Sequence, residues 1–292
     1  MIKTIAITGA NGQLGTVLQL LAPAFTQFKF VFTDIDELNI TDATQVRHFF
    51  NTYSPKYLIN CAAYTAVDKA ETDRKTAELL NVKAVQLLAE ECKLNKTKLI
   101  HISTYYVFDG ISSAPYTETD YTNPISVYGQ TKAGGEEAVL ASGCDGYILR
   151  TSWLYSAHGH NFLKTILRLA AERDTLNIVY DQIGTPTLAD DLAAAIMQFI
   201  VALNNKQKIK PGVFHFSNEG VCSWFDFAHA IVEIAGLNCA VIPILTAQYP
   251  TPATRPAISI LNKNKIKETL SIEIPHWRDS LNKVMAEIGV RG

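Results

Sequence analysis

A tyrosine and a lysine four positions apart are the residues of this sequence best suited to acid–base chemistry. Tyr128 and Lys132 stand in the segment Tyr-Gly-Gln-Thr-Lys, and the upstream pair Asn123-Pro124 with good helix formers downstream indicates that a helix starts here. Positions i and i+4 of a helix share one face. A phenol with a reference pKa of about 10 is a poor acid–base catalyst, but a nearby ammonium lowers that pKa. We therefore expect Tyr128 to donate a proton and Lys132 to lower its pKa.

The hydroxyl pair Ser103-Thr104 supports a catalytic role for Tyr128 and Lys132. Alone, Tyr-x-x-x-Lys often occurs by chance, with a surface lysine following a half-buried tyrosine. Ser103 and Thr104, however, end a short apolar run that has the composition of a strand. Strand carboxyl ends border the ligand crevice in open α/β sheets, so a hydroxyl here can hydrogen-bond a substrate carbonyl. We predict that a hydroxyl of this pair forms one catalytic site with Tyr128 and Lys132.

Three glycines near the start of the chain have the spacing of a phosphate-binding turn. Residues 9–15 read Gly-Ala-Asn-Gly-Gln-Leu-Gly, after a strand-like run and before a helix-like segment. Such a turn lets the backbone approach a pyrophosphate while helix N–H groups face the anion. We predict that NADPH or NADH is bound by Gly9, Asn11, Gly12, Gln13, Leu14 and Gly15.

Asp34 ends the second strand-like run, about twenty residues beyond the turn. A carboxylate at this place can accept hydrogen bonds from the adenosine ribose and would repel a 2′-phosphate. Asp34 therefore favours NADH. The competing interpretation is a solvated turn aspartate beside Asp36 and Glu37.

These residues require a fold that brings strand ends together. Short apolar runs rich in β-branched residues alternate with longer amphipathic segments, which is typical of βαβ units. The fold class is therefore α/β, a Rossmann-like doubly wound parallel sheet with a smaller C-terminal substrate-binding lobe. Strands are predicted at 4–8, 30–33, 57–60, 99–103 and 147–151, and helices at 15–22, 43–51 and 74–93.

The alternation becomes less regular after about residue 150. We assign residues 1–150 to an NAD(P)-binding Rossmann domain, to which the chain returns around 190–217, and residues 151–292 mainly to the substrate-binding lobe. The proline-rich tail from Pro243 should be extended loop around short helices. Further helices are predicted at 162–172, 190–202 and 224–235, and strands at 177–179 and 213–216.

The composition excludes several partners. Lys and Arg number 26 against 28 Asp and Glu, a formal net charge of -2, so no broad basic field is available for a nucleic acid. The five cysteines have no short metal-type spacing, which fits reduced thiols in a cytoplasmic protein without a metal site. We find neither a signal peptide nor an apolar stretch long enough for a bilayer, so we expect no membrane partner.

Together these residues resemble the extended short-chain dehydrogenase/reductases, and further segments narrow the resemblance to the dTDP-4-dehydrorhamnose reductase family. The resemblance covers nearly the whole chain. Its segments are Gly12 to Gly15, Asn60 to Glu71, Tyr106 to Gly110, Tyr128 to Lys132, Leu149 to Tyr155, Asp181 to Thr187, Tyr249 to Ala253 and Arg255-Pro256.

The resemblance implies reduction of the 4-keto group of a dTDP-linked sugar, dTDP-4-dehydro-L-rhamnose, to dTDP-L-rhamnose by NADPH or NADH. Tyr128 would donate the proton, Thr104 would polarise the sugar oxygen, and Lys132 would hold the nicotinamide ribose. Further residues implied at the site are Ala62, Ala63 and Thr65 in the cofactor cleft, and Val67, Tyr106 and Trp153 against the sugar.

Arg255 is a candidate for the nucleotide end of the substrate. It lies in the proline-stiffened segment from Tyr249 to Pro256, where a guanidinium could be presented for a bidentate phosphate contact. A net charge of -2 makes such local capture of phosphate necessary. The competing interpretation is a surface or inter-lobe salt bridge.

The sequence departs from the family at two positions. Tyr105 stands where the family usually has Asp, so substrate contacts that depend on this Asp are not carried over; Cys61 replaces a common Ala and should pack as a small hydrophobe. Some members dimerise through Mg²⁺ held by acids near the position of Asp190 and Asp191. Here two adjacent acids at a helix start are more simply explained as caps and dipole partners, and a homodimer is left open.

Three other functions compete with a reductase. A nucleotide-sugar dehydratase on the same fold needs a further acid–base pair beside the threonine, and Thr104 is followed by Tyr105 and Tyr106 instead. An epimerase is less easily excluded. From another class, the chain could be a non-catalytic NAD(P)-binding regulatory subunit resembling the methionine adenosyltransferase β-subunit, because fold alone never proves turnover. The complete set Thr104, Tyr128 and Lys132 favours an enzyme.

Overall fold

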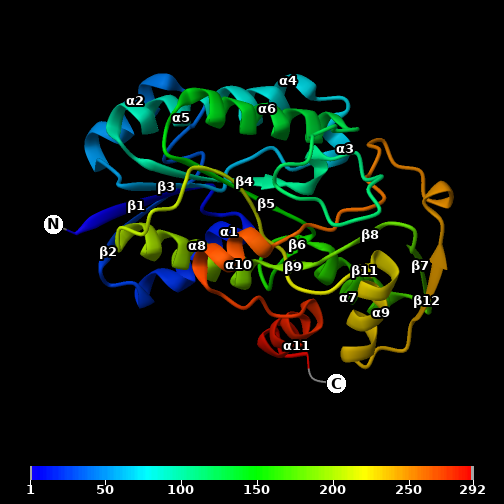
Figure 1. Ribbon diagram of the computed structural model, residues 1–292. Coiled ribbons are helices and arrows are strands. Elements are labelled where there is room, and N and C mark those ends of the chain that lie inside the picture. Colours follow the sequence, from blue (N-terminus) through cyan, green and yellow to red (C-terminus); the bar gives the residue numbers. More distant parts are fainter. Residues whose placement is uncertain (1, 291–292) are drawn as a thin grey trace.

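A six-stranded parallel sheet forms the centre of the computed structural model, which describes residues 2–290 (Figure 1). The strand order is β10-β5-β4-β3-β1-β2. From β1 the chain builds first to one side and then to the other, so the order reverses beside β1, where doubly wound sheets bind ligands. The strands are β1 (Lys3–Thr8), β2 (Phe28–Thr33), β3 (Tyr57–Asn60), β4 (Lys98–Thr104), β5 (Gly146–Thr151) and β10 (Gly212–His215).

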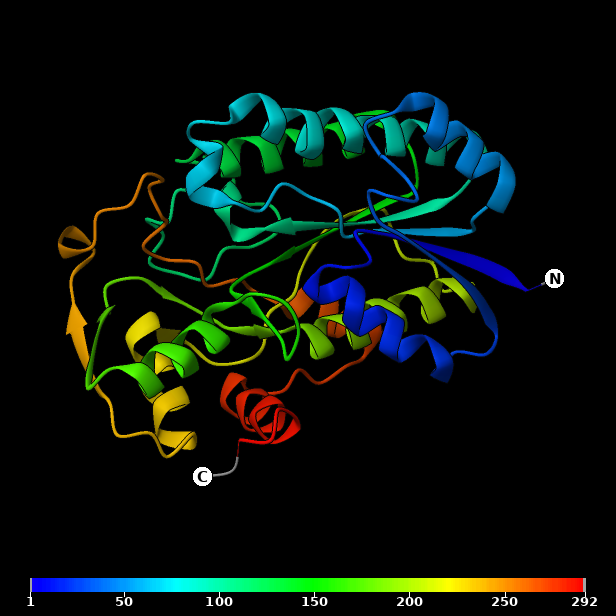
Figure 2. The ribbon, with the colours of Figure 1, turned by 180° about the vertical axis from the view of Figure 1, so that it is seen from behind.

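Helices cover both faces of this sheet (Figures 1 and 2). Successive side chains of a strand point to opposite faces, so Ile5 and Ile7 of β1 pack with α1 and α8, whereas Ala6 packs with α2 and α5. Burial on both faces explains why the strands are almost continuously apolar. The helices are α1 (Gln13–Leu21), α8 (Ala189–Asn204) and α10 (Asn264–Leu270) on one side, and α2 (Ala43–Tyr53), α5 (Ala84–Asn95) and α6 (Val127–Ser142) on the other.

A smaller lobe lies beyond the carboxyl ends of the strands (Figure 1). Its helices pack through a second apolar core that includes Leu163, Phe227 and Leu281. Its elements are α7 (Phe162–Glu172), α9 (Trp224–Ile234) and α11 (Trp277–Glu287), with the short strands β6 (Leu154–Tyr155), β7 (Thr175–Val179), β8 (Ile183–Gly184), β9 (Thr187–Leu188), β11 (Cys222–Ser223) and β12 (Ala240–Ile244).

The predicted fold class is confirmed: each predicted sheet strand is present within two residues at either end. The predicted helix 74–93 differs, because it is divided into α4 (Arg74–Glu78), a π-helical turn (Leu79–Lys83) and α5. The wide turn contains Asn81, whose Oδ1 accepts from the Tyr64 N–H at 2.8 Å and whose Nδ2 donates to the Tyr64 carbonyl at 3.1 Å. Nδ2 also donates to Thr131 Oγ1 at 3.0 Å. The irregularity therefore links this helix to α6.

Two neighbouring glycines test how closely α6 must approach that turn. A Cβ on Gly135 would overlap the Asn81 carbonyl oxygen, whereas one on Gly134 would meet only the Val82 side chain, at 3.1 Å. We expect Gly135→Ala to lower the free energy of unfolding by roughly 1–3 kcal/mol. Gly134→Ala should stay within about 1 kcal/mol of wild type, because alanine has the higher helix propensity. Denaturant unfolding measures both; equal stability of the two variants would refute the close approach.

Candidate active site

A cavity of about 880 Å³ lies between the glycine turn, the carboxyl ends of the central strands and the smaller lobe. It collects every residue predicted for the site except Arg255. The predicted residues that line it are Gly9, Asn11, Gly12, Gln13, Leu14, Gly15, Asp34, Ala62, Ala63, Thr65, Val67, Thr104, Tyr106, Tyr128, Lys132 and Trp153.

The glycine turn has the geometry that a dinucleotide pyrophosphate requires. Gly12 is the N-cap of α1 and no side chain caps this end, so the first N–H groups of the helix are free for an anion. Gly9 has a φ of 66°, and a Cβ there would lie 2.6 Å from the Ala62 nitrogen. The close approach of the turn to the segment that follows β3 therefore needs glycine. These residues fit a nicotinamide dinucleotide.

Asp34 closes the same end of the cavity. Its carboxylate accepts hydrogen bonds from the backbone N–H of Asn11 at 2.9 Å and of Ile35 at 2.8 Å, which fixes its orientation beside the turn. Among the described residues, Lys132 is the one Lys or Arg that lines the cavity. The Asp34 end of the cavity therefore has a carboxylate but no Lys or Arg side chain among its described lining residues.

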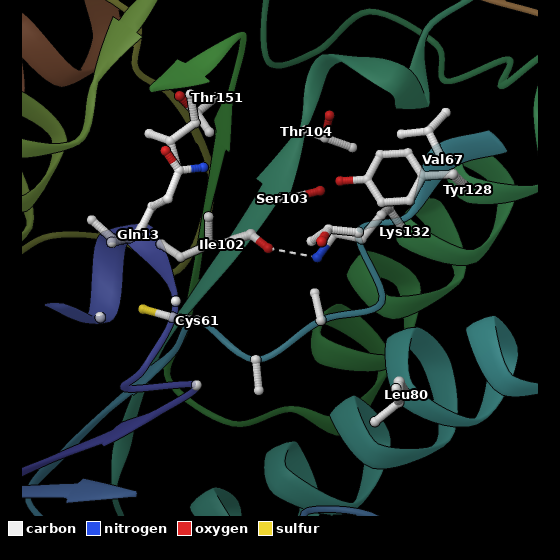
Figure 3. A pocket seen from close by; sticks show the side chains of 18 of the residues that line it. Gln13, Cys61, Val67, Leu80, Ile102, Ser103, Thr104, Tyr128, Lys132 and Thr151 are labelled. Carbon is white, nitrogen blue, oxygen red and sulfur yellow. Dashed lines mark hydrogen bonds between the residues drawn. The ribbon is translucent and has the colours of Figure 1, made fainter. Parts of the chain in front are cut away.

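Thr104, Tyr128 and Lys132 come together at the middle of the cavity (Figure 3). Ser126 is the N-cap of α6 and its side chain accepts from the Gly129 N–H at 3.2 Å, so the helix begins just before Tyr128. The Lys132 ammonium donates to the Ile102 carbonyl of β4 at 2.7 Å. Thr104 ends β4, and its Oγ1 accepts from the Tyr106 N–H at 3.2 Å.

Burial controls the protonation of Tyr128 and Lys132. It raises the pKa of the Tyr128 phenol well above its ordinary value, although a hydrogen bond with Thr104 acts in the opposite direction. Burial lowers the pKa of Lys132 to about 8, against the opposing influence of Glu136. Our expectation that Lys132 lowers the pKa of Tyr128 is therefore wrong for this structure, because desolvation dominates that pKa and the one influence that lowers it is the Thr104 hydrogen bond. Tyr128 keeps its proton, which is the form a proton donor needs.

A buried ion pair stands behind these residues. Arg150 of β5 donates to both carboxylate oxygens of Glu136 of α6, at distances of 2.6 to 3.1 Å, and Ser103 donates to the same carboxylate at 2.5 Å. Both charged side chains are at most 5% exposed. Sequence reasoning did not find this pair, which ties β4, β5 and α6 together directly behind Thr104 and Lys132.

Aromatic side chains form the wall toward the smaller lobe. Trp153 and Trp224 stack with ring centroids 3.6 Å apart and planes inclined by 8°. Trp153 holds a φ of 46°, a strained backbone for a large residue that the stacking helps to maintain. Tyr105 and Tyr106 also line the cavity. Trp224 and His160 were missed from the sequence, because they come from segments with no recognised motif.

Arg255 does not line the cavity. Its guanidinium forms an ion pair with Asp68, with bonds of 3.1 and 2.8 Å, and also donates to Thr251 Oγ1 at 2.5 Å. Asp68 belongs to α3 (Val67–Ala70) and additionally accepts from the Ala253 N–H at 3.2 Å. The pair thus joins the C-terminal loop to the segment that carries Val67, which is the arrangement foreseen in the competing interpretation.

Asp190 and Asp191 lie in the first turn of α8, where a negative charge interacts favourably with the helix dipole. Asp191 Oδ2 accepts from Asn218 at 2.7 Å and from Ser280 at 2.5 Å. Within residues 2–290, no group of three acidic, His or Cys side chains is arranged to hold a metal ion. Over the same residues, no helix has both the length and the apolar character to cross a membrane.

An open parallel sheet with a glycine turn at its reversal point, and Thr104, Tyr128 and Lys132 in the same cavity, defines a Rossmann-type reductase class. A family model described as the RmlD substrate binding domain matches residues 3–290. The chain belongs to this family, whose curated members include the dTDP-4-dehydrorhamnose reductases.

Two relatives and two solved structures illustrate the match. The dTDP-4-dehydrorhamnose reductase of Aggregatibacter actinomycetemcomitans is 40% identical over 97% of this chain and 98% of its own. That of Sinorhizobium fredii is 40% identical over 99% and 98%. The crystal structure of the Bacillus anthracis enzyme in complex with NADP has a TM-score of 0.93 and 38% identity, covering 98% of this chain and 100% of its own. The UDP-glucose 4-epimerase of Brucella ovis, 19% identical with a TM-score of 0.81 over 99% of each chain, shares the fold.

Lys132 should lower the stability of the folded chain. Its pKa falls from 10.5 to about 8, so the charged form costs on the order of 3 kcal/mol in the folded state at pH 7. We expect Lys132→Met to unfold at a higher temperature than wild type at pH 7. This advantage should shrink between pH 8 and 10.5, where the folded wild type has lost the proton that the unfolded chain keeps. Thermal unfolding across this range, with the exposed Lys83→Met as control, measures the effect; a pH-independent difference would contradict it.

Proposed function

We propose that the chain reduces the 4-keto group of dTDP-4-dehydro-L-rhamnose to dTDP-L-rhamnose with NADPH or NADH. The observation that carries the proposal is the meeting of Thr104, Tyr128 and Lys132 with the glycine turn in one cavity. When bound, the reduced nicotinamide would supply a hydride to the sugar C4 and so become oxidised, while the sugar oxygen takes a proton from the protein.

The roles of the three residues follow from their surroundings. Tyr128 holds a proton that burial retains on the phenol, and it can pass this proton to the developing alkoxide. Thr104, which lies next to it at the end of β4, polarises the same oxygen. Lys132, anchored on the Ile102 carbonyl, directs its remaining N–H bonds to the ribose of the nicotinamide.

The two walls of the cavity bind the two ligands. We assign the cofactor to the domain of residues 1–150 with the returning segment 190–217, through the glycine turn, Asp34, Ala62, Ala63 and Thr65. The sugar belongs to the opposite wall, where Val67, Tyr106 and the stacked Trp153 offer apolar and aromatic surface. A deoxy sugar with a methyl group suits such a wall, since its apolar face is buried against the rings.

We also propose that the protein acts in the cytoplasm, where reducing conditions keep cysteine thiols such as these in the free form. A homodimer remains a hypothesis from the family resemblance. Sedimentation of the purified chain distinguishes a dimer from a monomer.

A direct assay tests the function. Purified protein is mixed with enzymatically generated dTDP-4-dehydro-L-rhamnose and reduced cofactor, and the absorbance of the cofactor is followed. We expect one cofactor oxidised for each dTDP-L-rhamnose formed. Tight cofactor binding without oxidation would instead support a non-catalytic regulatory subunit, and consumption of the substrate without oxidation would support an epimerase.

Removing the phenol proton tests the role of Tyr128. Tyr128→Phe deletes one hydroxyl while the ring keeps its edge-to-face contact with Tyr106, whose centroid lies 5.2 Å away. General acid catalysis is worth about 10²–10⁴-fold, so kcat should fall by that factor while the Kd of the cofactor stays the same. Single-turnover hydride transfer measures the step; a near-normal rate would remove Tyr128 from the mechanism.

Asp34 should set the choice between cofactors. Its fixed carboxylate suits a ribose 2′-hydroxyl and repels a 2′-phosphate, so kcat/KM should be higher with NADH than with NADPH. Asp34→Ala should narrow the difference. The comparison of kcat/KM for both cofactors in both proteins decides the matter, and a strong NADPH preference that persists in Asp34→Ala would show that Asp34 plays no part.

Arg255 can bind the nucleotide diphosphate if it exchanges its partner Asp68 for phosphate. Loss of such a charge-assisted contact costs roughly 1.5–3 kcal/mol, so Arg255→Ala should raise KM for the dTDP-sugar about tenfold or more. Asp68→Asn, which keeps Arg255, should not raise it. If both variants instead lose thermal stability alike with KM unchanged, the ion pair is a brace between the lobes and binds no substrate.

A further inference from the structure

One hydroxyl in the cavity wall has no hydrogen-bond partner. Four side-chain atoms of residues 2–290 are buried without one: His101 Nε2, Thr151 Oγ1, Tyr155 Oη and Thr187 Oγ1. Of these residues only Thr151 lines the cavity. Thr151 is the last residue of β5 and is 7% exposed. A buried hydroxyl left unpaired lowers stability, and a ligand group that pairs it recovers this cost.

The position of Thr151 is fixed by the sheet. In the parallel register of β4 and β5 it stands directly beside Thr104, so the hydroxyls of both strand ends face the same ligand space. Behind it, Arg150 is held by the buried Glu136. The Thr151 side chain therefore belongs to a rigid wall, as a specific binding group requires.

Gln13 supplies a second polar group at this wall. The Lys164 N–H donates to Asn161 Oδ1 at 3.1 Å, so the Asn161 amide nitrogen is directed at Gln13 and donates to its Oε1 at 3.0 Å. Gln13 Oε1 is thereby identified, and Nε2 is the other end of the amide. Nε2 makes no hydrogen bond within residues 2–290. Figure 3 shows the Gln13 amide on the same side of the cavity as Thr151, away from Tyr128 and Val67.

A hydroxyl that can accept and an N–H that donates suit a ligand group that both donates and accepts. A primary carboxamide has a carbonyl oxygen to accept from Gln13 Nε2 and an NH₂ to donate to Thr151 Oγ1. The wall also lies beside the first turn of α1, where the proposed cofactor approaches. A sugar hydroxyl can also accept from one of these groups and donate to the other, but this wall adjoins the glycine turn, on the side of the cavity assigned to the cofactor.

We propose that Thr151 Oγ1 and Gln13 Nε2 bind the carboxamide of the nicotinamide ring and thereby fix which face of the ring is turned toward Tyr128. This inference rests on the proposed function, because it requires a nicotinamide cofactor in the cavity. Neither residue takes part in the transfer of hydride or proton; both position the ring.

Binding measurements on Thr151→Val test the proposal without turnover. The intrinsic fluorescence of the protein reports the Kd of the reduced cofactor that wild type binds more tightly, NADH or NADPH, and of the matching ADP-ribose or its 2′-phosphate, which lack the nicotinamide. We expect Thr151→Val to weaken cofactor binding roughly three- to tenfold and to leave ADP-ribose binding unchanged. Thr151→Ser, which keeps the hydroxyl, should restore the affinity.

A matched control separates the hydroxyl from its burial. Thr187 Oγ1 is also buried without a partner, but Thr187 does not line the cavity. Thr187→Val should therefore change neither Kd, and neither valine variant should unfold at a lower temperature, because no protein hydrogen bond is lost. A cofactor in which methyl replaces the carboxamide NH₂, the 3-acetylpyridine analogue, should bind Thr151→Val and Thr151→Ser with equal affinity.

The outcomes distinguish the two claims. If wild type binds no nicotinamide cofactor, the proposed function fails. If wild type binds and oxidises it, but Thr151→Val binds it with wild-type affinity, the function stands and the carboxamide contact is refuted. Equal weakening for the cofactor and for ADP-ribose would also refute the contact, since the defect would then lie outside the nicotinamide end.

Discussion

The buried ion pair between Glu136 and Arg150 is the interaction on which the site depends. Glu136 follows Lys132 by one helical turn, Arg150 precedes Thr151, and Ser103, which precedes Thr104, donates to the same carboxylate. One charge pair therefore sets α6 against β4 and β5 at the level of the catalytic side chains. Breaking such a pair by removing one partner commonly costs about 3–5 kcal/mol, because the other charge is left buried. The constraint explains how acid, hydroxyl and ammonium keep their spacing.

Burial then gives each group its chemical state. The phenol of Tyr128 is held in its protonated form by burial, which suits a reductase that must give a proton to an oxygen. Burial lowers the pKa of Lys132 to about 8, and the nearby carboxylate of Glu136 keeps this pKa from falling further. Burying a charged lysine lowers the stability of the fold, which is a common relation between an active site and its scaffold. Fold alone would not separate a reductase from the epimerase that shares it.

Local patterns made much of this predictable from the sequence. The glycine turn, Asp34 and the Tyr128–Lys132 spacing are each contained in one short segment, and the strands that place them are continuous apolar runs. What could not be predicted depends on contacts between distant segments. Trp224 stacks on Trp153 from a helix some seventy residues further along the chain. Asp68 forms an ion pair with Arg255, which is distant in the sequence. The pKa of Tyr128 also depends on burial, which a spacing does not reveal.

Following the transferred hydrogen tests the central claim that hydride passes directly to the sugar within this cavity. Reduced cofactor deuterated at the nicotinamide C4, on one face at a time, is supplied with dTDP-4-dehydro-L-rhamnose in ordinary water. The account predicts that dTDP-L-rhamnose carries one deuterium at its C4 from one of the two labelled cofactors and none from the other. A product without deuterium from either, or labelled equally from both, would contradict a single fixed orientation of the nicotinamide against the sugar.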